Sequence, residues 1–496
     1  MLRIRVIKTA SGANAVQVVY YRNRKRVVFK HIGSANSAQE LESLKIVAQD
    51  LIKNFDPEIP LFEETKLDNL LYLDKTEFLG VHFTFLYEVL SGLLSQIGLS
   101  QIKKLLLLDL VAIRVVEPAS KLRSIELIET YFGIRHRRQN YYQSAPQWPV
   151  LKERIESIIV EFAKENYAFN FDLLFYDVTT LYFETFKEDE LRKTGFSKDS
   201  KSQQPQILIG LLVTKEGFPI AYDIFPGNKF EGHTIIPVVN KFINKYAVKE
   251  FTVVADAAMI STTNTQELLN NDVNYIVGAR LSNLSNELIE LIDRTITRED
   301  GKSIRINTGN GYLVCSYSSV RYRKDKHEME KQIQKAKVII GTPSKGKKVK
   351  FIKTTGEQIV LNQALIEKSQ KLLGIKGYYT NLDEQTANNQ TIIERYHELY
   401  RVEQAFRISK HDLQTRPIFH FKEEPISLHT LICFMALALS KHIELATGDS
   451  IRRFVAECKK VTDARMLNTL TNKETRVRTK YNDKILNYLK CLNLPH

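Results

Sequence analysis

Apolar and polar residues alternate on both sides of Gly12 within the first 33 residues, which predicts a β-hairpin at the N-terminus. The tetrapeptide SAQE (37–40) has the form of a capping box and predicts a helix that ends near residue 54. The apolar spacing becomes helical over about 83–132, with a turn at Pro118, and is helical again over 151–166. The first third of the chain is therefore expected to be mainly helical after the hairpin.

Beyond residue 170 the pattern changes to short apolar runs that are typical of strands. FDLLFYDVTTLYFE predicts one strand, and QILIGLLVTKEGFPIAYDIFPGN predicts two more around a turn at Glu216–Gly217. Helical and strand-like segments then alternate as far as NYIVGARL. This β-β-β-α-β-α-β order predicts an α/β core with a mixed sheet and flanking helices.

The remaining segments complete the predicted organisation. Short strand-like pieces predict a β-rich insertion at 281–387, and helices are expected at about 390–411 and 425–446. The predicted parts are listed in order: an N-terminal region (1–150, with the hairpin at 1–33), a core (165–280 and 388–446), the insertion (281–387), and a basic helical C-terminal tail (447–496).

The net charge of the chain suggests a class of binding partner. The 496 residues carry a formal net charge of +14, which favours a polyanionic partner, nucleic acid before a membrane surface. The four cysteines lie far apart without metal-ligand spacing, so we expect reduced thiols in a cytoplasmic protein. The longest unbroken apolar runs are too short for a membrane span. The basic, aromatic segment 133–149 is compatible with a solvated linker or with a loop that contacts DNA.

Three carboxylates stand out from their surroundings. Asp177 lies in the middle of an apolar strand, Asp256 ends the run TVVAD, and Glu403 lies in the predicted helix 390–411. Residues spaced by seven lie on nearly one helix face, which groups Tyr396, Glu403 and Lys410. A buried carboxylate costs free energy unless it is paired or bound to a metal.

Such a set of oxygen ligands suits two Mg²⁺ ions about 4 Å apart, the arrangement that serves phosphodiester cleavage. Each carboxylate also has a purely structural interpretation. Asp177 can accept hydrogen bonds from threonines of its own strand, Asp256 can cap the next helix, and Glu403 can pair with Arg407 at i+4. The spacing alone leaves both interpretations open.

Four segments together resemble the DDE transposases of bacterial insertion sequences: FYDVTTLYFE, PGNKFEGHT, VVADAAMIS and RYHELYRVEQAFRISK. The last is similar to the Tyr-x2-Arg-x3-Glu-x6-Lys signature of one branch of that family. The resemblance covers about 170–445. It implies an RNase H-like catalytic core and a metal-dependent cut-and-paste reaction, in which DNA strands are cleaved at the terminal inverted repeats of the element and transferred to a target.

The same resemblance implies that Asp177, Asp256 and Glu403 form the catalytic, metal-binding triad for two Mg²⁺ ions, which Mn²⁺ can replace. It implies double-stranded DNA as partner, both terminal repeats and target, and a dimer in the synaptic complex, with the protein in the cytoplasm on the nucleoid. The N-terminal region is expected to recognise the repeats. The basic segments RNRKR (22–26) and SKGKKVK (344–350) are either DNA contacts or solvated loops.

The signature also assigns DNA-binding positions to Tyr396 and Lys410. At the position of the signature Arg the chain has Leu399. Either Arg401 or Arg407 replaces that phosphate contact, or the pattern is relaxed in this branch, or activity is reduced.

Two other functions are compatible with these residues. A catalytically inactive relic of a transposase would bind the repeats as a repressor without cleaving them. An RNase H-like host nuclease would cleave branched DNA whatever the sequence of its ends.

Overall fold

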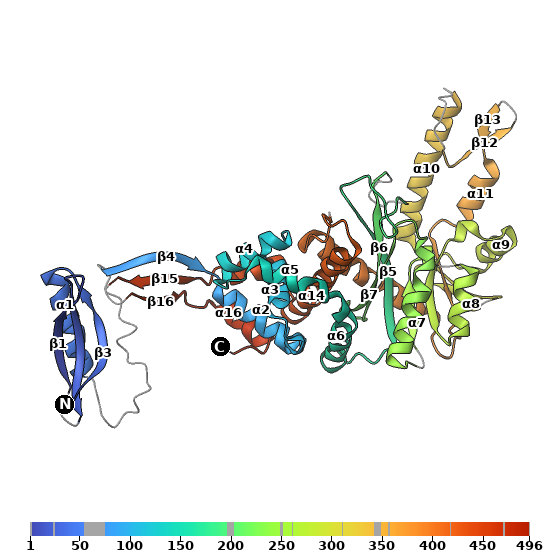
Figure 1. The fold of residues 1–496 in the computed structure, drawn as a ribbon. Coiled ribbons are helices and arrows are strands. Elements are labelled where there is room, and N and C mark those ends of the chain that lie inside the picture. The colour runs from blue at the N-terminus through green and yellow to red at the C-terminus, as the bar shows by residue number, and fades with distance from the viewer. Residues whose placement is uncertain are drawn as a thin grey trace. The chain divides into compact units, whose positions relative to one another are not determined.

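The computed structural model describes residues 2–22, 25–53, 75–195, 203–248, 251–259, 261–309, 311–341, 349–355, 358–416, 418–469 and 472–495. The chain divides into two compact units (Figure 1). Unit 1 comprises Met1–Leu90, Ile125–His136 and Arg453–His496, and unit 2 comprises Ser91–Ser124 and Arg137–Arg452. The boundary expected near residue 150 therefore differs from the division between the compact units.

Unit 1 begins with a three-stranded antiparallel sheet and one helix. The elements are β1 (Arg3–Lys8), β2 (Asn14–Arg22), β3 (Lys25–Ala35) and α1 (Ala38–Lys53). Val16 and Val18 of the central strand are buried in one core with Leu44 and Ala48 of α1. The predicted hairpin corresponds to β1 and β2, and β3 extends it by a third strand.

The helix α1 begins at the predicted capping box. The Ser37 hydroxyl accepts the Glu40 N–H at 3.2 Å, and the Glu40 carboxylate accepts the Asn36 N–H at 2.9 Å. Residues 54–74, which follow this helix, lie outside the described part of the chain.

Unit 1 also contains a second three-stranded sheet, built from segments nearly 400 residues apart. Its elements are β4 (Thr76–His82), β15 (Asp463–Asn468) and β16 (Lys473–Arg478), followed by α16 (Asp483–Cys491). Arg478 joins the sheet to neighbouring elements through ion pairs at 2.7 Å with Asp463 and Glu88. The expectation of a wholly helical tail at 447–496 is wrong, because β15 finds its partner in β4.

Unit 2 contains several helices, and α3 and α6 pack against a long apolar helix, α14. The elements are α2 (Thr84–Gln96, shared with unit 1), α3 (Leu105–Val116), α4 (Lys121–Phe132, also shared), α5 (Arg138–Ser144), α6 (Lys152–Tyr167), α14 (Glu423–Thr447) and α15 (Ile451–Cys458, also shared). By length and composition α14 is sufficient to cross a membrane, but 94% of its apolar window is buried. It is the core helix of this unit.

The segment 133–149 is not a solvated linker. It forms α5 and short 3₁₀ turns, and it buries Tyr141 and Trp148, which are 8% and 1% exposed. Its neighbour Tyr142 is 61% exposed. The segment is therefore part of the packed structure on one side and presents an aromatic ring to solvent on the other.

The centre of unit 2 is an eight-stranded mixed sheet, in agreement with the predicted α/β class (Figure 1). The spatial order is β10 (Ser303–Thr308), β11 (Gly311–Tyr317), β14 (Ile375–Thr380), β9 (Asn274–Ala279), β8 (Thr252–Ala255), β5 (Leu173–Tyr182), β6 (Gln206–Val213) and β7 (Pro219–Pro226). The pairs β5–β8 and β8–β9 are parallel, and the other pairs are antiparallel. Helix α7 (Ile235–Tyr246) connects β7 to β8, and α8 (Thr262–Asn270) connects the parallel strands β8 and β9.

The segment expected to be a β-rich insertion contains strands and helices. Its helices are α9 (Asn286–Thr295), α10 (Ser319–Gly341) and α11 (Gln363–Lys371), and it adds a small hairpin, β12 (Ile352–Thr355) with β13 (Gln358–Leu361). The strands β10, β11 and β14 extend the central sheet beyond β9. The insertion is thus continuous with the core through backbone hydrogen bonds. Most of the basic segment 344–350 lies outside the described residues.

A buried basic cluster lies between α3, α4 and α14. Lys121 is 5% exposed, and its Nζ lies 3.1 Å from Nδ1 of His429. Arg114 donates to the Ala119 carbonyl at 2.6 Å and also lies beside His429. Burial, followed by the Arg114 charge, lowers the pKa of Lys121 to about 7.

This lowered pKa predicts a pH-dependent stability that Lys121→Met removes. Between pH 7 and 10.5 the unfolded chain holds the proton that the folded chain has released, so stability from this group rises with pH, by at most about 1.4 kcal/mol per pH unit. Thermal unfolding from pH 6.5 to 9.5 should show a smaller rise in Tm for Lys121→Met than for wild type. The exposed control Lys104→Met should keep the wild-type slope; equal slopes for all three proteins would contradict the assignment.

Candidate active site

The register of two parallel strands brings the first two predicted carboxylates together. Tyr176 of β5 is opposite Ala255, the last residue of β8, so Asp177 and Asp256 are the next residue on each chain. Neighbouring strands lie about 4.8 Å apart, so Asp177 and Asp256 occupy adjacent backbone positions. Asp177 is half-buried, with buried residues on both sides of it in β5.

The loop after Asp256 is held by a buried amide. The Asn264 side chain donates to the carbonyls of Gly232 and Met259 at 2.5 and 2.7 Å. It thereby ties the turn η6 (Glu231–His233) to the turn η7 (Ala257–Met259). The cap of the following helix α8 is Ser261. The structural interpretation in which Asp256 caps this helix is therefore wrong.

Glu403 lies on the middle of three short helical segments rather than on one continuous helix. They are α12 (Asn389–His397), α13 (Tyr400–Arg407) and a π-helical turn, η9 (Ile408–Asp412). Between the first two, hydrogen bonds of the i→i+3 type join Leu399 to Tyr396 and Val402 to Leu399. These bonds tighten the backbone between α12 and α13. The helical spacing of side chains in the sequence gives no sign of this break.

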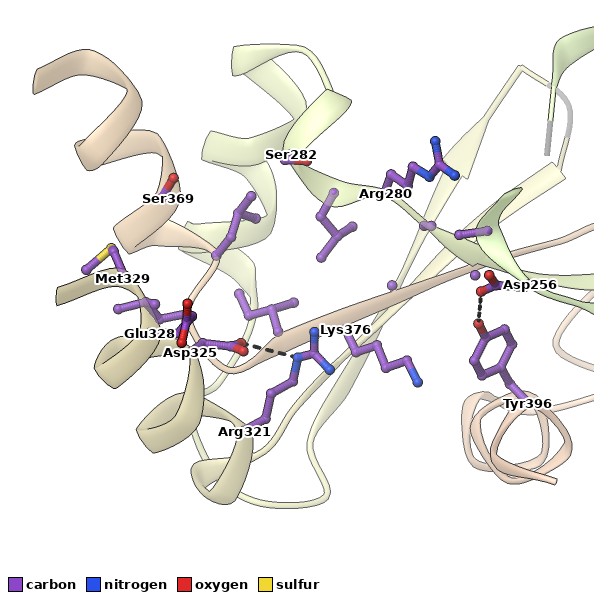
Figure 2. A pocket seen from close by; sticks show the side chains of 18 of the residues that line it. Asp256, Arg280, Ser282, Arg321, Asp325, Glu328, Met329, Ser369, Lys376 and Tyr396 are labelled. Atoms are coloured by element: carbon purple, nitrogen blue, oxygen red, sulfur yellow. Dashed lines mark hydrogen bonds and ion pairs between the residues drawn. The ribbon is translucent and has the colours of Figure 1, made fainter. Parts of the chain in front are cut away.

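Asp256 and Glu403 line the same cavity, of about 720 Å³. Tyr396, Leu399 and Lys376 are also in its wall, and so are residues of α10 from the insertion (Figure 2). Asp177 and Lys410 are not among the residues that line it. The cavity therefore combines residues of the core and of the insertion.

Tyr396 contacts a carboxylate in this structure. Its hydroxyl donates to Oδ1 of Asp256 at 3.3 Å (Figure 2), and its ring packs on Tyr378 with centroids 4.9 Å apart. Burial and then the charge of Asp256 raise the pKa of Tyr396, so the hydroxyl keeps its proton. The tyrosine is 7% exposed and acts here as a positioning group for Asp256.

Gly278 of β9 provides the space for this hydroxyl. A Cβ at this position would lie 2.5 Å from the Tyr396 hydroxyl and 3.2 Å from Cβ of Ala257. The hydrogen bond to Asp256 therefore depends on the absence of a side chain on the neighbouring strand.

Lys376, near the start of β14, is a cavity residue that the sequence analysis missed. Its Nζ lies 4.6 Å from the centroid of the Tyr396 ring. Burial and the nearby Arg321 lower its pKa, while Asp256 and Glu403 act in the opposite direction. The ammonium group is thus placed in the electrostatic field of both carboxylates. No local motif marks it, because its position depends on the pairing of β14 with β9.

Arg280 is a second basic residue that the sequence analysis did not select. It follows the last residue of β9 and lines the cavity (Figure 2). Together with Lys376 it adds positive charge to the cavity lining.

The structure distinguishes the predicted DNA-binding residues. Arg401 forms an ion pair with Glu398 at 3.6 Å, and Leu399, at the signature position, is 6% exposed. Arg407 is exposed, and no ion pair joins it to Glu403 within the described residues, contrary to the structural interpretation of Glu403. Lys410 is half-buried on η9.

The donor chemistry fits a hard divalent cation. Asp177, Asp256 and Glu403 offer only carboxylate oxygens, which are the ligands that Mg²⁺ prefers. In the part of the chain that the structure describes, however, no three His, Cys, Asp or Glu side chains are gathered closely enough to hold a metal ion. The strand register makes Asp177 and Asp256 neighbours in the sheet, and Asp256 lines one cavity with Glu403, but the three described carboxylates do not form one tight cluster.

The segment that contains these residues matches a family of known proteins. The family described as "Transposase DDE domain" matches residues 170–439, more than half of the chain. Among solved structures, a piggyBac transposase synaptic complex with hairpin DNA is similar over 84% of this chain and 75% of that chain, with 13% sequence identity and a TM-score of 0.37. A search of curated proteins finds no match.

The close approach at Gly278 predicts the effect of adding one methyl group. Gly278→Ala should lower the free energy of unfolding by about 1–3 kcal/mol, because the new Cβ overlaps the Tyr396 hydroxyl. In a Tyr396→Phe background the same substitution should cost less, since the overlapping atom is gone. Gly309→Ala is the control, with open space around its Cβ. Additive effects of the two substitutions in urea unfolding would contradict the contact.

Proposed function

The chain belongs to the family of transposases with a DDE domain, and on this basis we propose that it cleaves and joins DNA strands at the ends of a mobile element. The observation that carries the proposal is the strand register that places Asp177 beside Asp256, together with the cavity that Asp256 shares with Glu403. The element we propose is a bacterial insertion sequence, and the reaction is cut-and-paste transfer.

The strand order supports an RNase H-like core. Three antiparallel strands, β7, β6 and β5, are followed across the sheet by two strands parallel to β5, namely β8 and β9. In this arrangement the first carboxylate lies on β5, the second directly follows the neighbouring strand β8, and the third comes from α13, which packs against β5. The strands β14, β11 and β10 then widen the sheet on the β9 side.

In this proposal Asp177, Asp256 and Glu403 would hold two Mg²⁺ ions. Bound there, the ions would supply Lewis-acid stabilisation of the phosphate and a lowered pKa for the attacking oxygen. The residues around them have separate tasks. Tyr396 fixes the orientation of Asp256, and Lys376 offsets negative charge that accumulates as phosphate approaches the carboxylates.

The partner we propose is double-stranded DNA, both the terminal inverted repeats and the target. The N-terminal sheet is a suitable recognition element, since Arg3, Lys8, Lys25 and Arg26 are exposed on it. Arg407, exposed on the same helix as Glu403, is better placed than Arg401 for the phosphate contact of the missing signature Arg, because Arg401 is paired. Two ends must meet for transfer, so we propose a dimer in the DNA complex.

One observation favours a second candidate, a DNA-binding relic without cleavage. Leu399 replaces the basic residue of the signature and is buried in the cavity wall, where it contributes no charge. Such a protein would bind the repeats with a steep salt dependence but would cleave them in no divalent metal.

The triad assignment predicts a complete loss of cleavage without a loss of folding. Asp177→Asn, Asp256→Asn and Glu403→Gln should each abolish Mg²⁺- or Mn²⁺-dependent nicking of a duplex that carries the repeats flanking the reading frame, because each removes a charged metal ligand. Glu394→Gln, on the exposed side of α12, is the matched control and should cleave normally. Cleavage by any of the three variants at the wild-type rate refutes the triad, and a wild type that binds but never cleaves establishes the relic.

Lys376→Gln should reduce cleavage by about 10²-fold, as loss of a preorganised charge contact does. The expected cause is electrostatic, so thermal stability and repeat binding should stay near wild type. Lys353→Gln, an exposed lysine of the small hairpin, serves as the control. Single-turnover rates measure the effect, and a rate equal to wild type would remove Lys376 from the reaction.

A further inference from the structure

The helix α10 begins at the active-site cavity and extends away from it. Its 23 residues correspond to about 35 Å. Arg321, Asp325 and Glu328 in its first half line the cavity beside Lys376 (Figure 2). Both the backbone N–H and the hydroxyl of Ser319 donate to Asp300 at 2.5 Å, which anchors the start of the helix. The direction of α10 from the site is thus fixed at its base.

One face of α10 packs against other residues of the insertion. Met329, Ile333 and Ala336 pack in a small core with Phe351 and Ile366. Asp325 lies beside this face and pairs with Arg321 at 3.3 Å. Glu328 lies further around the helix, also in the cavity lining, and accepts a hydrogen bond from Gln332 at 3.3 Å. Two of the three negative charges of α10 are therefore directed toward the cavity side.

A different face of α10, about 100° around the helix from Asp325, carries a strip of three lysines, with Glu328 at its edge. Lys324, Lys331 and Lys335 are spaced by seven and four residues, so they fall within about 40° of one line along the helix. All three are exposed, and none forms an ion pair with any described residue. A row of anions with the same spacing would neutralise the charges of these three lysines.

We propose that Lys324, Lys331 and Lys335 form a docking strip for the duplex DNA next to the cleavage point. The inference rests on the proposed function and adds where the flanking DNA lies. The helix rise separates the lysines by about 10 Å and 6 Å, which correspond to about three and two base-pair steps. The whole helix covers about ten base pairs. Because α10 starts at the carboxylate cavity, DNA that enters the cavity continues along this strip.

The test asks whether the gain in binding affinity from a longer duplex depends on these lysines. Duplexes that end close to the cleavage point are compared with duplexes extended by about ten base pairs on either side, in EDTA so that no cleavage occurs. For the wild type, one of the two extensions should tighten binding about tenfold at 0.1 M salt. In the variant Lys331→Gln/Lys335→Gln this gain should vanish, and the slope of log K against log salt should fall by about 2. Glutamine keeps the helix propensity of the segment.

The matched control is Lys103→Gln/Lys104→Gln, two exposed lysines away from α10. It removes the same charge and should keep the full gain from the extension. A loss of the gain in both variants would show a general charge effect and overturn the strip, as would a lysine variant that keeps the gain. If the wild type gains from neither extension but still cleaves the repeats, the docking strip alone is wrong. If the wild type neither binds nor cleaves the repeats, the proposed function itself is wrong.

Discussion

The register between β5 and β8 is the constraint on which the site depends. Four consecutive pairs, from Leu173 with Thr252 to Tyr176 with Ala255, fix this register, and every residue of β8 is buried. A slip of one residue would move each side chain to the other face of the sheet, so packing strongly opposes it. The strand β8 ends at Ala255, so Asp256, at the position next to Asp177, lies just beyond the strand end. Asp177 itself is half-buried, which lowers the cost of its charge relative to full burial.

The insertion contributes to the site through the sheet rather than as a separate lobe. Since β14 pairs with β9, Lys376 is brought toward the carboxylates, and α10 is brought to the cavity wall. The cavity consequently contains both acidic groups from the core and basic groups from the insertion. This mixture suits a phosphodiester, whose negative charge must be held while the carboxylates remain ionised.

Local sequence patterns predicted most of the core and little of the long-range pairing. The capping box at Ser37 and the strand alternation around Asp177 correspond to elements that the structure contains, because capping and apolar periodicity act within a few residues. The pairing of β15 with β4 and the extension of the sheet by β10, β11 and β14 join distant segments, and no local pattern encodes such partners. The break between Tyr396 and Leu399 was missed for a different reason, since both flanking segments keep helical spacing. The roles of Gly278 and Lys376 likewise depend on a contact with Tyr396 of α12, which is distant from both in the sequence.

The central claim is that Asp177, Asp256 and Glu403 converge on two divalent ions when DNA is bound. The most direct measurement is a structure of the chain with a repeat-end duplex and Mn²⁺, in which anomalous scattering locates the metal. The account predicts two manganese peaks about 4 Å apart, with carboxylate oxygens of all three residues as ligands. Manganese bound without one of these three residues, or at another group of side chains next to the scissile phosphate, would contradict it.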